Sequence, residues 1–194
     1  MPLVTYSGIE FNHLNPTKEM INIDDIVTAL HRLNRFVGHS SRAYNVAEHS
    51  FNCFRMAGLL GYSDREKFLT LIHDFTEAYV GDCPTPLKML LPDFSAIEKK
   101  VELAIYDYLD ISPPTEEEET KIKVVDLTML AIEMRDLTHH DWREFTNDDR
   151  VDCDAMRAFT LDSESNDFDT KTSILLFKKL FQVTLQNVKR EQGE

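Results

Sequence analysis

Apolar residues recur at helical spacing along most of the chain. Ile26, Leu30 and Leu33 lie at positions i, i+4 and i+7, which predicts a first helix from about Asp24 to Arg35. The same kind of pattern predicts further helices over approximately residues 46–60, 68–80, 93–109, 115–137 and 170–188. Most of the chain is therefore expected to be helical.

Capping residues precede three of these predicted helices. Asn45 stands directly before the second helix and can accept a hydrogen bond from its first turn. Ser63 with Glu66, and Thr115 with Glu118, have the spacing of capping boxes, in which each side chain bonds the backbone amide of the other residue. These pairs predict where the third helix and the long fifth helix begin.

The remaining segments are polar or rich in glycine and proline. Residues 3–14 alternate apolar and polar residues around Ser7-Gly8, which predicts a β-hairpin. Proline lacks an amide donor, and a polar run has no apolar stripe that could face a core. These features predict loops at residues 36–44, 81–86 and 138–152, the last of them with short helical turns. The expected fold class is all-α, a helical bundle with a small N-terminal β-hairpin, in a single domain over residues 1–194.

The charge of the chain limits its partners. The 34 acidic and 21 basic residues give a formal net charge of −13, which disfavours nucleic-acid polymers but permits a small phosphorylated ligand at a local cation site. No apolar run approaches the roughly 20 residues that span a bilayer, and the first residues lack a secretory layout. A cytoplasmic protein without membrane association is expected, with Cys53, Cys83 and Cys153 reduced.

Histidine and aspartate residues stand on helix faces whose other positions are apolar. His49 lies on an apolar stripe of the second predicted helix, His73 and Asp74 lie in an apolar part of the third, and Asp126 lies among apolar residues of the fifth. Burying an unpaired carboxylate is costly, and a cation compensates for that cost. Two imidazoles and two carboxylates form a nitrogen and oxygen site suited to Mn, Co, Fe, Ni or Zn.

Each of these residues alone has a simpler explanation. A single histidine on an apolar stripe is more often a core residue, Asp126 could pair with a lysine or arginine, and a His-Asp dipeptide occurs by chance in many proteins. Glu133, seven residues beyond Asp126, could face the pocket, but a structural role is favoured, and His139-His140 is interpreted as a solvated pair. The coincidence of such residues on three separate helices favours a metal site.

Four short motifs then relate the chain to a known family. They are Ala-Glu-His-Ser (47–50), Ile-His-Asp-Phe-Thr-Glu (72–77), Gly-Asp-Cys-Pro-Thr-Pro (81–86) with Lys88, and Val-Val-Asp (124–126). In this order they resemble the HD-domain nucleotide phosphohydrolases, in particular the YfbR-like 5′-deoxynucleotidases and the phage dATP triphosphohydrolases of the DatZ type. The upstream segment, from Tyr6-Ser7-Gly8 through the element from Arg35 to His39 and on to Tyr44–His49, is similar to the phage proteins in particular. The resemblance runs over about residues 5–135.

The resemblance implies a role for each matching residue. It implies that the metal ligands are His49, His73, Asp74 and Asp126, with Asp74 also part of the catalytic group. It implies that Glu77 assists proton transfer and that Lys88 contacts the substrate phosphate and takes part in catalysis. The remaining substrate contacts that it implies are Arg35 and His39 at the phosphate, Phe36 at the sugar or base, and Asp82 and Thr85 in the sugar-binding loop.

The expected function is hydrolysis of a deoxynucleotide with a divalent transition metal as cofactor, Co, Mn, Zn, Ni or Fe, with Mg at a second site as an alternative. A dATP-type triphosphohydrolase that releases deoxynucleoside and triphosphate is the leading hypothesis. The alternatives are a 5′-deoxynucleotidase acting on monophosphates, a phosphodiesterase acting on cyclic or signalling nucleotides, and a non-enzymatic helical module with a structural metal. The family resemblance also implies a homo-oligomer, a dimer or a larger assembly.

Overall fold

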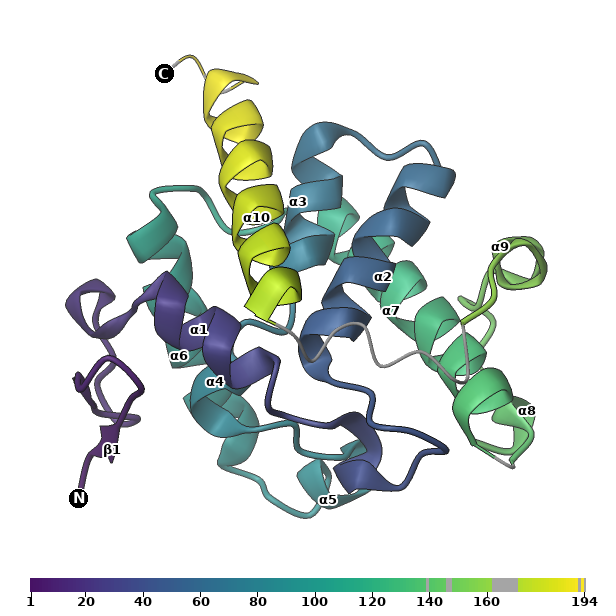
Figure 1. The fold of residues 1–194 in the computed structure, drawn as a ribbon, viewed down its shortest axis with the longest axis horizontal. Helices are drawn as coiled ribbons and strands as arrows, with labels where there is room; N and C mark the ends of the chain where they lie inside the picture. The colour runs from purple at the N-terminus through teal and green to yellow at the C-terminus, as the bar shows by residue number, and fades with distance from the viewer. Residues whose placement is uncertain (139, 146–147, 162–170, 192, 194) are drawn as a thin grey trace.

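Helices make up most of the structure, a computed structural model that describes residues 1–138, 140–145, 148–161, 171–191 and 193. The predicted all-α class with a small N-terminal hairpin is confirmed (Figure 1). In order, the elements of the described residues are β1 (Leu3–Val4), β2 (Glu10–Phe11), η1 (Lys18–Met20), α1 (Ile23–Leu30), η2 (Arg35–Gly38), α2 (Val46–Leu59), α3 (Asp64–Ile72), α4 (Glu77–Val80), α5 (Thr85–Lys88), α6 (Phe94–Leu109), α7 (Glu116–Leu137), α8 (Trp142–Phe145), α9 (Cys153–Ala158) and α10 (Lys171–Glu191).

The hairpin is fastened to the helices by a buried carboxylate. β1 and β2 pair antiparallel, with Leu3 opposite Phe11. The amide and hydroxyl of Ser7, in the turn, donate hydrogen bonds of 2.6 and 2.7 Å to the Asp25 carboxylate in α1. Phe11 is fully buried and stacks on Tyr79, so this short sheet is part of the packed structure.

The predicted helix caps are present. Ser63 and Glu66 form a capping box at the start of α3, and Thr115 and Glu118 form one at the start of α7. The Asn45 side chain accepts a hydrogen bond of 2.9 Å from a backbone amide in the first turn of α2. Local side-chain chemistry therefore explains where these three helices begin.

Several helix boundaries differ from the prediction. The first helix ends at Leu30 instead of continuing to Arg35, and the predicted loops at 36–44 and 81–86 contain the short helices η2 and α5. The third predicted helix is not continuous, because α3 ends at Ile72 and α4 begins only at Glu77. The His73 ring donates to the Thr70 carbonyl at 2.7 Å, and so competes for an acceptor that a continuing helix would use for its backbone.

The helices α2, α3 and α7 pack against one another, and this packing positions the candidate site. Two buried apolar clusters surround them. One joins α1, α3, α6 and α10, and the other joins α2 and α7 to α8 and α9. Figure 1 shows α10 lying alongside α3 and α1, where Phe177 and Phe181 contact Phe75.

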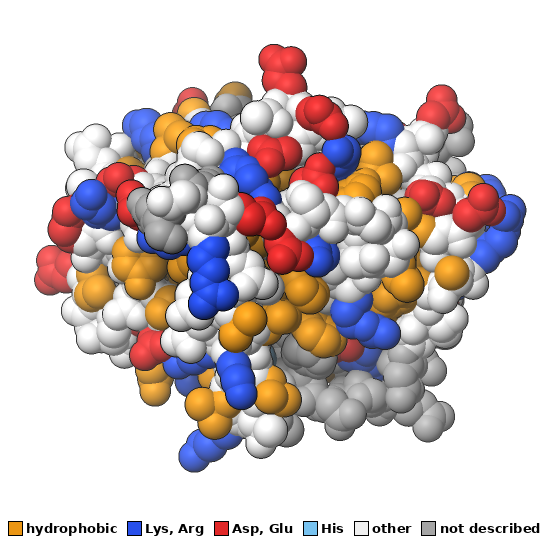
Figure 2. Space-filling model, turned by 90° about the horizontal axis from the view of Figure 1, so that it is seen from above, with side chains coloured by type: hydrophobic (Ala, Val, Ile, Leu, Met, Phe, Trp, Pro, Cys, Tyr) orange, Lys and Arg blue, Asp and Glu red, His pale blue; other side chains and the backbone are white. Residues whose placement is uncertain are grey.

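The surface carries exposed apolar side chains as well as charged ones. On the face shown in Figure 2, acidic and basic side chains are interspersed among smaller apolar areas. Of the helices in the described part of the chain, none combines the length and apolar character that crossing a membrane requires.

Candidate metal centre

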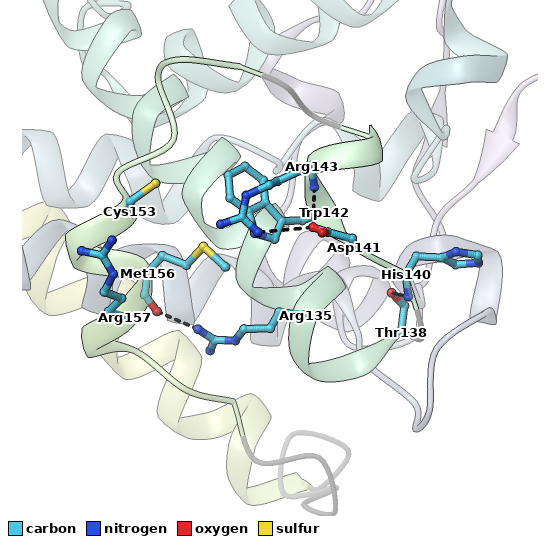
Figure 3. A pocket seen from close by; sticks show the side chains of 9 residues that line it. All are labelled: Arg135, Thr138, His140, Asp141, Trp142, Arg143, Cys153, Met156 and Arg157. Atoms are coloured by element: carbon cyan, nitrogen blue, oxygen red, sulfur yellow. Dashed lines mark hydrogen bonds and ion pairs between the residues drawn. The ribbon is translucent and has the colours of Figure 1, made fainter.

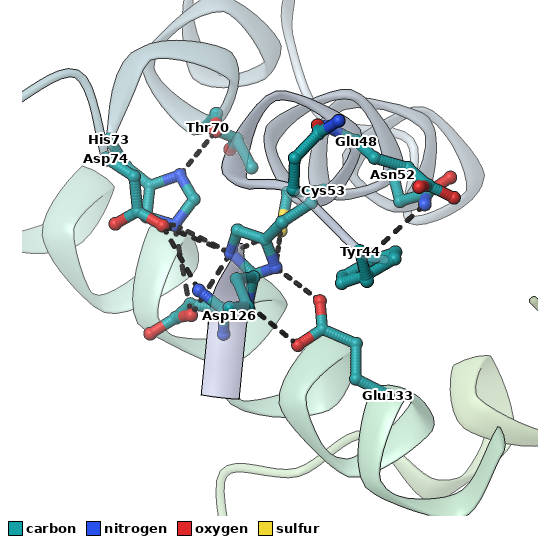
Figure 4. A network of polar contacts seen from close by, with 12 residues as sticks. Tyr44, Glu48, Asn52, Cys53, Thr70, His73, Asp74, Asp126 and Glu133 are labelled. Atoms are coloured by element: carbon teal, nitrogen blue, oxygen red, sulfur yellow. Dashed lines mark hydrogen bonds and ion pairs between the residues drawn. The ribbon is translucent and has the colours of Figure 1, made fainter. Parts of the chain in front are cut away.

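Four predicted ligands from three helices meet at one point. His49 lies in the first turns of α2, His73 and Asp74 follow the end of α3, and Asp126 lies in the middle of α7. His49 Nε2 lies 3.3 Å from His73 Nε2, 3.3 Å from Asp74 Oδ2 and 3.6 Å from Asp126 Oδ1. His73 Nε2 lies 3.3 Å from Asp74 Oδ2 and 3.8 Å from Asp126 Oδ1, and Figure 4 shows these side chains converging.

These separations fit a single divalent ion. Four donors placed about 2.1 Å from one ion at the corners of a tetrahedron lie about 3.4 Å from one another. The five distances range from 3.3 to 3.8 Å. The donor set of two imidazoles and two carboxylates therefore has both the chemistry and the spacing of a transition-metal site.

Hydrogen bonds on the far side of each imidazole orient it for metal binding. His49 Nδ1 lies 2.5 Å from Oε1 of Glu133, and His73 Nδ1 lies 2.7 Å from the carbonyl oxygen of Thr70. An ionised carboxylate and a carbonyl can only accept, so in both rings Nδ1 carries the proton. In the neutral form of each ring, Nε2 then directs its lone pair at the common point, as ligand histidines require.

The electrostatics of the cluster favour a positive charge at its centre. Burial alone would lower the pKa of His73, but Asp74 and Asp126 raise this pKa to about 9. Burial likewise raises the pKa of Asp126, yet His73, Lys123 and His49 together hold it well below its usual value. Asp126 also pairs with a lysine, as the simpler interpretation supposed, because Lys123 Nζ lies 2.8 Å from Oδ2 while Oδ1 faces the histidines.

Metal binding is expected to compete with protonation of His73. The ion needs the neutral ring, and the pKa of His73 without metal is about 9. The apparent affinity for Co²⁺ should therefore rise about tenfold per pH unit up to about pH 9 and then level off. At neutral pH, about one proton should be released for each ion bound. Titration calorimetry in buffers with different ionisation heats measures this, and binding without proton release would contradict the competition between the ion and a proton at His73.

Arg35 lies beside the cluster, as predicted, and is held there by two carboxylates. Its Nε donates to Glu133 Oε2 at 3.0 Å, and its Nη1 lies 3.6 Å from Asp74 Oδ2. Burial acts to lower the pKa of Arg35, but Glu133, Asp74, Asp82 and Glu77 raise it well above its usual value. The guanidinium is therefore permanently charged next to the metal position.

The turn that presents Arg35 has an unusual backbone. Phe36 and Val37 have φ values of 56° and 54°, in the left-handed region that costs a residue with a Cβ about 1–2 kcal/mol. Val37 is exposed, so its own side chain does not compensate for this strain. The Arg35 guanidinium lies 5.8 Å from the centre of the Phe36 ring, which places Phe36 at the arginine but shows no sugar or base contact.

Glu77 and Asp82 form an acidic edge next to the cluster. Burial, followed by the charges of Asp74 and Asp82, raises the pKa of Glu77 well above its usual value, and Arg35 opposes this. Oε2 of Glu77 is buried without a hydrogen-bond partner among the described residues. Burial also raises the pKa of Asp82, while Arg35 lowers it. Both residues are therefore within electrostatic reach of the metal position.

The other predicted substrate residues either have partners other than the four donors or are exposed. Lys88 Nζ forms an ion pair with Glu98 Oε2 of α6 and lies 5.4 Å from the centre of the Phe94 ring. Thr85 begins α5 and is exposed, and His39 is exposed at the end of η2. The structure thus brings Arg35 next to the four donors and Glu77 and Asp82 within electrostatic reach of them, whereas the contacts of Lys88 in the described part of the chain are with Glu98 and Phe94, and Thr85 and His39 are exposed.

Two further residues contact the centre. Glu133, interpreted from sequence as structural, is fully buried and bonds both His49 and Arg35. Glu133 lies seven residues after Asp126, about two helical turns, and this spacing is the signal in the sequence that the two side chains share a helix face. Cys53 Sγ lies 3.5 Å from Nε2 and 3.9 Å from Nδ1 of His49, which places it against the ring as a further candidate donor.

A separate pocket of about 480 Å³ lies where the end of α7 meets α8 and α9 (Figure 3). Its arginines have partners: Arg135 bonds the carbonyls of Met156 and Phe159, and Arg143 and Arg157 pair with Asp141 and Asp154. His140 lines this pocket, whereas His139 of the predicted solvated pair lies outside the described residues. The three cysteines are free, as expected.

Comparison with known proteins shows the family to which the chain belongs. The HD domain family matches residues 28–165, which include all four converging side chains. The chain is 39% identical over 133 residues to the uncharacterized protein YfdR of Escherichia coli strain K12, covering 69% of this chain and 70% of that protein. It is 37% identical over 87 residues to an uncharacterized protein of Rhodobacter capsulatus, covering 42% and 44% of the two chains. This chain therefore belongs to the HD-domain family, whose members are generally metal-dependent phosphohydrolases.

Proposed function

We propose that this protein hydrolyses deoxynucleotides at the ester bond between the α-phosphorus and O5′, with a divalent metal as cofactor. The observation that carries this proposal is the meeting of four nitrogen and oxygen donors beside Arg35 and Glu77. The leading substrate is a deoxynucleoside triphosphate of the dATP type, and the products are deoxynucleoside and triphosphate. The resemblance of the motifs to phage triphosphohydrolases supports this choice of substrate.

The residues around the cluster have the properties that this reaction needs. When bound, a divalent ion polarises a phosphoryl oxygen and makes water more acidic. Arg35 offers fixed guanidinium donors next to the ligand Asp74, where they stabilise negative charge on the transferring phosphoryl group. Burial and the charges of Asp74 and Asp82 raise the pKa of Glu77, which suits a carboxyl group that assists proton transfer to or from the reacting groups.

A 5′-deoxynucleotidase acting on monophosphates is the second candidate, and it breaks the same bond. The pairing of the basic residues near the metal position favours this second candidate. Arg35 is paired with Glu133 and Lys88 with Glu98, so each of these cations already has a carboxylate partner. Such a site is better balanced for one phosphate group than for a chain of three.

Product analysis separates these candidates. The protein is incubated with Co²⁺ or Mn²⁺ and a panel of deoxynucleoside triphosphates, deoxynucleoside monophosphates and cyclic nucleotides, and the products are separated by ion-exchange chromatography. Deoxynucleoside with triphosphate supports the leading proposal, and deoxynucleoside with phosphate supports the second candidate.

Other outcomes contradict the proposal. Turnover of cyclic nucleotides alone would make the protein a phosphodiesterase. Stoichiometric metal binding without turnover of any nucleotide in the panel would favour a structural metal in a binding module. Calorimetry with the same ions establishes metal binding independently of activity.

A further inference from the structure

Glu133 joins two parts of the site that are distant in the sequence. It is fully buried in α7, and its two carboxylate oxygens have different partners (Figure 4). Oε1 lies 2.5 Å from His49 Nδ1, 84 positions away, and Oε2 lies 3.0 Å from Arg35 Nε, 98 positions away. The Tyr44 hydroxyl also bonds this carboxylate. One buried side chain thus contacts both a candidate metal ligand and the candidate phosphate-binding arginine.

Each of these bonds sets an orientation. The Glu133 carboxylate can only accept a hydrogen bond from His49 Nδ1. The proton of the neutral His49 ring therefore stays on Nδ1, and the Nε2 lone pair faces the metal position. The bond from Arg35 Nε fixes one edge of the planar guanidinium, which leaves Nη1 directed toward Asp74, 3.6 Å from Oδ2. The same carboxylate therefore orients the ligand ring and the arginine together.

We infer that Glu133 is a positioning residue that selects the metal-binding tautomer of His49 and, through the same carboxylate, holds Arg35 at the metal position. This inference rests on the metal site of the proposed function. It assigns Glu133 a role in both metal affinity and anion binding, although Glu133 itself would contact neither the metal ion nor the anion.

Replacing Glu133 with glutamine gives a specific test because an amide, unlike a carboxylate, is not symmetric. Arginine has only donors, so the amide oxygen of the glutamine must face Arg35, and its NH₂ group must then face His49 Nδ1. The NH₂ group donates to Nδ1 and thereby moves the ring proton to Nε2, where the metal must bind. Glu133→Gln is therefore expected to reverse the tautomer of His49 and weaken Co²⁺ binding about 10- to 100-fold.

A double variant separates this effect from general damage to the core. In Glu133→Gln with Arg35→Met, the amide oxygen is released from the arginine and can accept from His49 Nδ1. The Nδ1–H tautomer and most of the Co²⁺ affinity should then return, although a second substitution has been added. The matched control is Asp25→Asn, which alters a buried carboxylate that bonds Ser7 of the hairpin, and it should leave Co²⁺ affinity unchanged.

The measurements are ¹⁵N NMR of histidine-labelled, metal-free protein for the tautomer and Co²⁺ absorption titration for affinity. An Nδ1–H tautomer in folded Glu133→Gln, or wild-type Co²⁺ affinity in that variant, would overturn the inference. If that variant does not fold, wild-type protein still decides, because an Nε2–H tautomer at His49 contradicts the role of Glu133. Failure of wild-type protein to bind Co²⁺ would instead refute the proposed function, and the tautomer result would stand separately.

Discussion

Asp126→Ala is expected to reduce hydrolysis of the preferred nucleotide by on the order of 10³-fold, the equivalent of losing several kcal/mol of transition-state stabilisation. Asp126 Oδ1 lies 3.6 Å from His49 Nε2 and 3.8 Å from His73 Nε2, so the substitution removes one of four converging donors. It also removes a negative charge that balances the ion. The measurements are kcat with saturating Co²⁺ and the ratio of bound metal to protein by elemental analysis.

The control for this variant is Asp107→Ala, which makes the same chemical change at an exposed position on α6. Asp107 pairs with Lys18, and both side chains are more than half exposed. The control should keep its metal content and turnover. Full turnover of a folded Asp126→Ala protein would show that Asp126 is not a ligand.

Arg35→Ala is expected to have the largest effect on stability, lowering the free energy of unfolding by about 3–5 kcal/mol. The reason is that Glu133, which is 0% exposed, would lose the cation that offsets its burial. Burial raises the pKa of Glu133, and Arg35 followed by His49 brings it below its usual value. Urea unfolding in the presence of EDTA measures this loss without a contribution from bound metal.

Lys18→Ala provides the comparison, because the Lys18–Asp107 pair joins side chains that are 52% and 63% exposed. Exposed pairs contribute about 0–1 kcal/mol, so this variant should unfold almost as wild type does. An equally small change for Arg35→Ala would mean that Glu133 does not depend on Arg35 for its charge. In that case the hydrogen bonds through which Glu133 connects Arg35 to His49 would contribute little to the free energy of unfolding.

Much of the helical framework could be predicted from local sequence. The capping boxes at Ser63 and Thr115 act over three residues, so the starts of α3 and α7 are encoded where they occur. Likewise, the apolar stripe around His49 predicted a buried histidine, and His49 is 0% exposed. These features depend on contacts within one or two helical turns, which periodicity in the sequence represents directly.

The break in the third helix was not predicted because it depends on a side chain that competes with the backbone. The sequence from Phe68 to Val80 is largely apolar and contains no glycine or proline that would predict a break. His73 nevertheless bonds the Thr70 carbonyl, and α4 begins only at Glu77. This break places His73 and Asp74 together at the metal position, an arrangement that regular helical spacing of about 100° per residue does not favour.

The sequence by itself determined the helical class and the starts of α2, α3 and α7, because these follow from local patterns, and its short motifs singled out the four side chains that converge. Only the tertiary structure decided that Glu133 binds both His49 and Arg35, and that Lys88 pairs with Glu98. The Glu133 contacts join residues 84 and 98 positions apart. Such pairings depend on how helices pack and on which buried charge lies nearest, and no local pattern in the chain encodes that geometry.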